Sequence, residues 1–148
     1  MNIDKVKNSP YLLKTNLIVL VALFFLFLGF FFVPIIGETL NPFFLFLIFT
    51  FLFLGGSLTF LSAKANIQPR LRKFLLLTGV SAVGFPLFVV LHNFFYALGV
   101  LSLRFLILLQ VFEILHVVAF LISLIICPIG FIVGMFGSIY LFFIKREP

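Results

Sequence analysis

Hydrophobic residues fill four long stretches of this chain, and charged residues are confined to the chain ends and the segments between the stretches. The stretches without Asp, Glu, Lys or Arg are 15–37, 39–63, 74–103 and 114–144. A helix of about 20 apolar residues crosses the ~30 Å hydrocarbon core of a bilayer. Each stretch is long enough for this, so the pattern predicts an all-α membrane protein. The expected fold is a four-helix transmembrane bundle with up-down topology.

The pattern indicates one membrane domain over residues 1–148. Its expected spans are about 15–36, 42–62, 74–97 and 114–144, with a short outer segment at 98–113. Composition agrees, since 64% of the residues are hydrophobic and 9% are charged. Soluble domains average about 45–50% apolar and about 25% charged residues. The last two stretches are longer than a span needs, and Pro86 and Pro128 are the expected kink sites.

Basic residues lie on one side of the four-span arrangement, apart from Arg104. They are Lys5, Lys7, Lys14, Lys64, Arg70, Arg72, Lys73, Lys145 and Arg146. The positive-inside rule then places both termini in the cytoplasm, most simply at the plasma membrane. The net charge of +6 is spread along the ends of the spans. It therefore favours a lipid bilayer as the partner and argues against nucleic acid.

A stripe of small residues follows one face of the fourth span at helical spacings of three and four. Its members are Gly137, Gly134, Gly130, Cys127, Ser123 and Ala119, and His116 continues the face toward the outer end. Helices in lipid pack through such faces because small side chains let their backbones approach closely. On the third span the expected partner rows are Gly79, Pro86 and Asn93, and Ala82, Val89 and Tyr96. We expect the third and fourth spans to pack tightly; the alternative is a homodimer through 130–137.

Polar residues gather near the outer ends of the same two spans. The third span carries His92, Asn93 and Tyr96, and the fourth carries Gln110, Glu113 and His116. Spacings of three and four place each trio on one side of its helix. Ionisable groups are uncommon in membrane spans and often mark a site. The sequence predicts that the two trios meet.

Three kinds of chemistry fit this cluster. The favoured one is a structural hydrogen-bond network, with Arg104 paired to Glu113. The second is proton transfer by Glu113 and His116 in a small transporter or channel. The third is a metal site with His92, Glu113 and His116 as ligands, or a haem-binding protein, although a single E-x-x-H pattern supplies few ligands. No cofactor is predicted.

Motifs of catalysis are missing from the sequence. The strings G-x-S-x-G, G-x-G-x-x-G and the P-loop do not occur. The only cysteine is Cys127, so the chain forms no internal disulfide. The leading prediction is a non-enzymatic structural or interaction component, with another membrane protein or a second copy as its partner. The alternative is the small transporter or channel.

Overall fold

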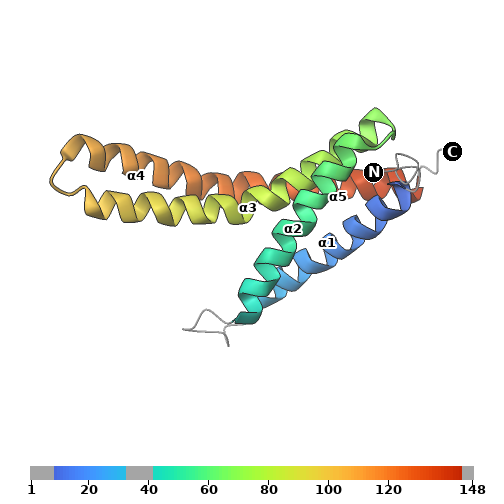
Figure 1. Ribbon diagram of the computed structural model, residues 1–148, viewed down its shortest axis with the longest axis horizontal. Coiled ribbons are helices and arrows are strands. Elements are labelled where there is room, and N and C mark those ends of the chain that lie inside the picture. Colours follow the sequence, from blue (N-terminus) through green and yellow to red (C-terminus); the bar gives the residue numbers. More distant parts are fainter. Residues whose placement is uncertain (1–8, 33–41, 145–148) are drawn as a thin grey trace, which may run out of the picture.

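Four long helical runs make up the described part of the chain, which in this computed structural model is residues 9–32 and 42–144 (Figure 1). The first three runs are α1 (Ser9–Phe32), α2 (Pro42–Lys64) and α3 (Pro69–Leu101). The fourth run joins α4 (Leu106–Leu121), the π-helical η2 (Ile122–Ile126), α5 (Cys127–Ile139) and the π-helical η3 (Tyr140–Ile144). All four runs are long and apolar enough to cross a membrane. The prediction of a small multi-pass membrane protein of the all-α class is confirmed.

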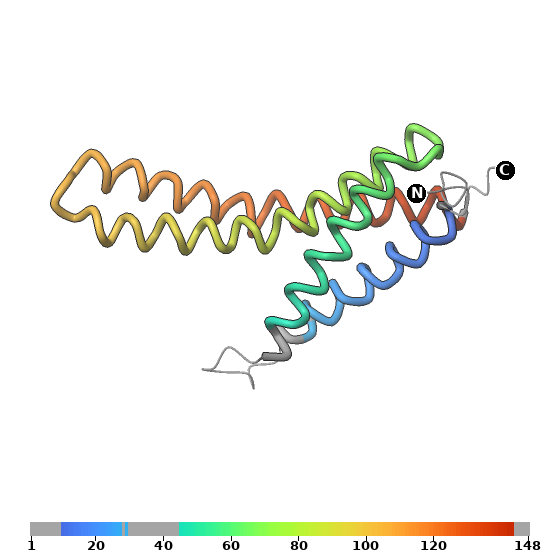
Figure 2. Tube along the Cα trace, in the orientation of Figure 1, coloured from blue at the N-terminus to red at the C-terminus, as the bar shows by residue number. Residues whose placement is uncertain are grey.

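The four runs form an open V in place of a parallel bundle. Helices α1 and α2 make one arm, and α3 with the fourth run makes the other; the arms join near the connection between α2 and α3 and then diverge (Figures 1 and 2). The joined end carries five described basic residues and is called the basic end below. These residues are Lys14, Lys64, Arg70, Arg72 and Lys73. The other expected basic residues, Lys5, Lys7, Lys145 and Arg146, lie outside the described residues.

Helix α3 is the central element, because it packs on α2 and also on the fourth run. Where α2 crosses α3, a Cβ atom added to Gly55 would lie 2.8 Å from the Cβ of Ala82. One added to Gly79 would lie 2.8 Å from the carbonyl oxygen of Gly55 and would also meet Thr59. Gly79 and Ala82 therefore face α2, and the prediction that they face the fourth span is wrong. A close crossing needs small residues on both helices.

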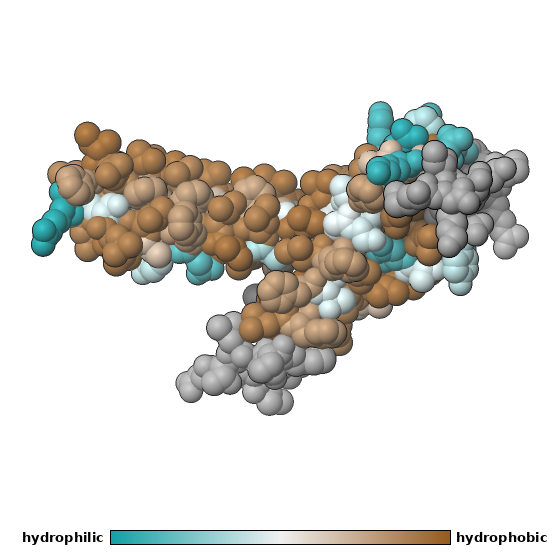
Figure 3. Space-filling model, viewed as in Figure 1, coloured by the Kyte–Doolittle hydropathy of each residue, from teal (hydrophilic) through white to brown (hydrophobic). Residues whose placement is uncertain are grey.

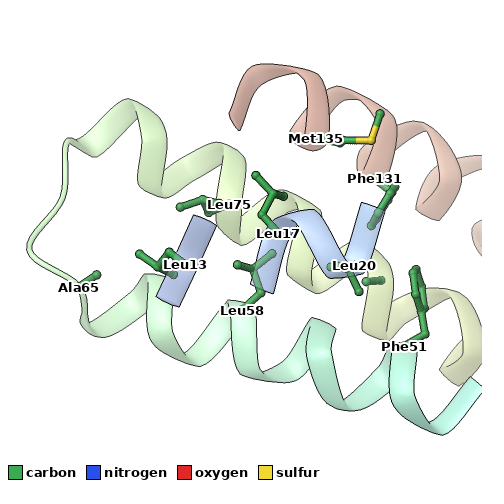
Figure 4. Close-up of a cluster of buried hydrophobic side chains, with 10 residues drawn as sticks. Leu13, Leu17, Leu20, Phe51, Leu58, Ala65, Leu75, Phe131 and Met135 are labelled. Atoms are coloured by element: carbon green, nitrogen blue, oxygen red, sulfur yellow. The ribbon is translucent and has the colours of Figure 1, made fainter. Parts of the chain in front are cut away.

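The hydrophobic core lies at the joined end of the V (Figure 4). Helix α1 contributes Leu13, Leu17 and Leu20, which are fully buried. Facing side chains come from the other helices and include Phe51, Leu58, Leu75, Phe131 and Met135. The ring of Phe131 stacks on that of Phe24, with centroids 4.5 Å apart. Bulky side chains thus fill the space between the arms where they meet.

The expected outer segment at 98–113 is divided between two helices. Helix α3 continues to Leu101, and α4 already begins at Leu106. The chain reverses over residues 102–105, where the amide of Phe105 donates to the carbonyl oxygen of Ser102 at 2.8 Å. Leucine, isoleucine and phenylalanine dominate here and no proline intervenes, so both helices extend toward the turn. The end of the expected first span, 33–36, lies outside the described residues.

Both expected kink prolines lie inside helical runs. Pro128 is the second residue of α5, just after η2, and Pro86 lies within the continuous helix α3. Proline has no amide hydrogen, so Pro128 cannot donate to a carbonyl of the turn before it, and the π-helical segment lies in that turn. Pro128 therefore coincides with a local change of helix type.

Apolar and hydrophilic residues occupy different parts of the molecular surface. Apolar residues cover most of both arms, and hydrophilic residues lie at the joined end, at the tip of the α3–α4 hairpin and at a few places along the lower edge of the long arm (Figure 3). At the basic end, Lys14 Nζ lies 4.0 Å from the ring centroid of Phe143, and Arg72 Nη2 donates to the carbonyl oxygen of Ala65 at 3.2 Å. These contacts tie the start of α1 to η3 and brace the α2–α3 connection.

Candidate functional site

The small-residue stripe of the fourth run lies against α3. A Cβ atom added to Gly134 would lie 2.5 Å from Thr78 Oγ1 and 2.9 Å from the carbonyl oxygen of Phe74. One added to Gly130 would lie 2.5 Å from Ser81 Oγ. The glycines of α5 therefore let it approach α3 closely. Because α3 occupies this face, it is not free for a homodimer.

Two histidines join α3 to α4 beyond this seam. The rings of His92 and His116 stack with centroids 4.0 Å apart and an interplanar angle of 23°. Each ring also contacts the backbone of the other residue. His92 Nδ1 lies 3.2 Å from the carbonyl oxygen of His116, and His116 Nδ1 lies 3.2 Å from that of His92. The pair forms a reciprocal clasp between antiparallel helices.

The clasp determines which nitrogen of each ring carries a proton. A carbonyl oxygen only accepts, so each Nδ1–H must donate. In the neutral rings, Nε2 is then the unprotonated nitrogen and keeps its lone pair. Interhelical hydrogen bonds in membranes contribute about 0.6–2 kcal/mol each. The geometry fits the favoured structural interpretation of His92 and His116.

The other members of the predicted cluster behave differently. The ring centroids of Tyr96 and His116 are 5.4 Å apart, so Tyr96 lies next to the clasp. Asn93 is exposed, and its Nδ2 donates to the carbonyl oxygen of Val89 in its own helix at 2.8 Å. Gln110 is exposed on α4 and makes no hydrogen bond with any described residue. The two trios therefore meet only in part.

Glu113 lines a shallow pocket beside the clasp. The pocket has a volume of about 160 Å³ and lies between α3 and α4. Its lining includes Phe95, Tyr96, Phe112, Glu113 and His116. Glu113 forms no ion pair with Arg104, so the predicted pairing is wrong. The carboxylate has no protein partner among the described residues.

The expected metal ligands do not come together as a set. Among the described residues, no group of three or more His, Cys, Asp or Glu side chains is placed to hold a metal ion. His92 and His116 adjoin each other, but each directs Nδ1 to a backbone carbonyl. The described side chains therefore supply fewer ligands than the usual three or four of a zinc site.

A second polar group, which the sequence patterns did not predict, lies near the basic end. Asn16 is buried in α1, and its Nδ2 donates to Ser57 Oγ of α2 at 2.9 Å. Thr78 and Ser81 are buried on α3 against the glycines of α5. The available signal was an amide in an otherwise apolar span, together with hydroxyls at helical spacing. The bond from Asn16 joins α1 to α2, while Thr78 Oγ1 donates within α3 to the carbonyl oxygen of Phe74.

Comparison with models of protein families, with curated proteins and with solved structures finds no significant match for this chain.

Proposed function

We propose that this protein is a non-enzymatic interaction component of a membrane, in which the α3–α4 arm contacts other membrane-embedded chains. The basic end faces the cytoplasm in this proposal, as the positive-inside rule favours. The observation that carries the proposal is the packing of α4. Its principal neighbour is α3, and Ala119 is its only buried residue.

The exposed surface of α4 supports contact with a transmembrane partner. It is apolar over most of its length, with Ile107 78% exposed and Ile114 63% exposed. Gln110 lies on this surface without a hydrogen-bond partner. An amide in hydrocarbon gains from an interhelical hydrogen bond, by about 0.6–2 kcal/mol. A partner helix that supplies a polar side chain would satisfy Gln110.

The joined end argues for a structural role over a transport pathway. Leu17, Leu58 and Leu75 are fully buried there. Asn16 Nδ2 donates to Ser57 Oγ between α1 and α2, while Asn16 Oδ1, Ser62 Oγ and Ser138 Oγ are buried without a hydrogen-bond partner among the described residues. A transport site near the bilayer midplane would need open space between the helices. Filled packing favours a rigid body that carries an exposed arm.

Cysteine crosslinking in native membranes tests the proposal. Val111, Ile114 and Val118 are exposed on α4, so each is changed to Cys in a Cys127→Ala background. With a short bifunctional thiol reagent, we expect these variants to give discrete species of higher mass. Mass spectrometry then shows whether the partner is a second copy or another membrane protein.

Phe53→Cys on α2 is the matched control, because Phe53 is 73% exposed but lies on the other arm. It should react with a membrane-permeant maleimide and give little crosslinked product. If the α4 cysteines also react with the maleimide yet yield only monomer, the arm has no protein partner and the proposal fails.

A further inference from the structure

An unpaired carboxylate lies on an apolar arm of the molecule. Glu113 is the only Asp or Glu among the described residues, and it is exposed on α4. It makes no hydrogen bond or ion pair within that part of the chain. A charged side chain in a transmembrane segment is costly unless it is paired or hydrated. Glu113 therefore favours a positively charged ligand.

Aromatic residues line the same pocket as Glu113. The pocket of about 160 Å³ is lined by Phe95, Tyr96 and Phe112 as well as by Glu113. The face of an aromatic ring attracts a cation, and rings grouped around a pocket recognise alkylated ammonium ions. We propose that this pocket binds the alkylammonium group of a small organic cation or of a lipid headgroup.

The histidine clasp holds one wall of the pocket. His116 lines the pocket, and its Nδ1–H donates to the carbonyl oxygen of His92. This bond fixes the orientation of the ring, and in the neutral tautomer it leaves no proton on Nε2. A neutral imidazole does not repel a cation. Glu113 thus supplies the charge, and Tyr96 and Phe112 supply aromatic surface.

A metal ion fits this pocket less well than an organic cation. Zinc and similar ions take three or four nitrogen, sulfur or oxygen ligands at about 2.0–2.3 Å. No such group of side chains exists among the described residues. An alkylammonium ion instead needs one counter-charge and apolar surface around its alkyl groups, as this pocket provides.

Binding of choline to the purified full chain in an uncharged detergent tests the proposal. The neutral control is 3,3-dimethyl-1-butanol, in which carbon replaces the charged nitrogen. By calorimetry we expect choline to bind and the alcohol to bind at least tenfold more weakly. Glu113→Gln should weaken choline binding at least tenfold, because it removes the charge and keeps the shape of the side chain. Tyr96→Leu should weaken it about 2- to 30-fold, the range of a lost cation–π contact.

Gln110→Ala is the matched control, because Gln110 lies on α4 but does not line the pocket. It should bind choline like the unchanged chain. Glu113 makes no hydrogen bond or ion pair among the described residues, so Glu113→Gln should unfold at an unchanged temperature without ligand. Tyr96→Phe, which keeps the ring, should retain binding that Tyr96→Leu loses, and so provides a second comparison.

The source of the ammonium group is found by native mass spectrometry with phosphatidylcholine and phosphatidylglycerol. Retention of phosphatidylcholine that Glu113→Gln abolishes identifies a lipid headgroup, and binding of free choline alone identifies a soluble cation. Equal binding of choline and the neutral alcohol, or unchanged binding by Glu113→Gln, overturns the proposal. The proposal is also overturned if neither choline nor phosphatidylcholine binds and a protein that co-purifies with the unchanged chain is lost from Glu113→Gln. None of these results depends on crosslinking through α4, so the interaction role stands or falls separately.

Discussion

Glycines in this chain differ sharply in what surrounds them, although their spacing in the sequence looks alike. Gly134 lies in the seam between α5 and α3, where an added Cβ would be 2.7 Å from the amide nitrogen of Thr78. Backbone atoms cannot move aside as a flexible side chain can. At Gly56, on α2, an added Cβ would have no heavy atom within 4 Å. The two positions therefore separate the effect of close packing from the effect of helix propensity.

Gly134→Ala should destabilise the protein by about 1–3 kcal/mol, because the helices must separate to admit the methyl group. Gly56→Ala should be neutral or stabilising by up to about 1 kcal/mol, since alanine favours a helix. Unfolding by sodium dodecyl sulfate in mixed micelles, followed by circular dichroism, measures both. Equal stability of the two variants would contradict the close seam.

The sequence predicted which face of the fourth helix packs closely, but it did not predict which residues of α3 that face contacts. Spacing alone placed Gly130, Gly134 and Gly137 on one face of the fourth helix. Spacing could not say which residues of α3 meet that face, because α3 is packed on two sides. Its small residue Gly79 serves the crossing with α2, while Thr78 and Ser81 meet α5.

At the scale of helices, the fourth run keeps its small residues on one face by changing its winding. In this stripe, two successive members are four residues apart, first from Ala119 to Ser123 and then from Ser123 to Cys127. At 3.6 residues per α-helical turn, each step of four rotates the side chain about 40° beyond one full turn around the helix axis. The wider turn of η2, Ile122–Ile126, offsets this drift. Ala119, Ser123 and Cys127 all remain buried. The double step of four, followed by proline, was the signal in the sequence for this segment.

The pairing of α3 with α4 near the turn can be tested by a disulfide. A Cβ atom at Gly99 would lie 3.8 Å from the Cβ of Phe112, which is the mean separation in disulfides. Gly99→Cys with Phe112→Cys should therefore crosslink within one chain under mild oxidation. A changed mobility on non-reducing gels, with the bridged peptide identified by mass spectrometry, measures this.

Ala97→Cys with Phe112→Cys is the control pair, because Ala97 is exposed on another face of α3. Crosslinking of the control pair alone would mean a different register.

The sequence predicted a separate outer segment at 98–113. Apolar residues next to Arg104 and Glu113 are compatible with either a helix or an interfacial segment. The closeness of Gly99 to Phe112 shows that α3 and α4 stay paired up to the turn.

For the whole molecule, the open V is consistent with helices of unequal length in one bilayer. Helices α1 and α2 have 24 and 23 residues, so each is about 35 Å long at 1.5 Å per residue. Helix α3 has 33 residues and is about 50 Å long. Helix α3 is longer than a hydrocarbon core of about 30 Å is thick, so it must tilt to keep its apolar residues within the core. The first arm can then stand nearly upright while the second leans, as the divergence of the arms allows (Figure 1). The sequence predicted the unequal lengths, but the direction of the lean depends on the α2–α3 crossing.

The leaning arm predicts where the turn at residues 102–105 lies. Leu101 and Phe105 are 80% and 65% exposed, and apolar surface in water costs about 25 cal/mol per Å². The tip should therefore remain in the membrane near its interface, where the exposed charge of Arg104 can reach the headgroups. The chain contains no tryptophan, so Phe105→Trp gives a single fluorescent reporter. Its emission should be blue-shifted, and brominated acyl chains should quench it more than aqueous iodide does.

Two further single-tryptophan variants serve as references. Phe53→Trp on α2 is the apolar reference. Asn66→Trp is the polar reference, because Asn66 is exposed in the connection at the basic end. An emission like that of Asn66→Trp would mean that the arm projects into water and that the V does not lie within the bilayer.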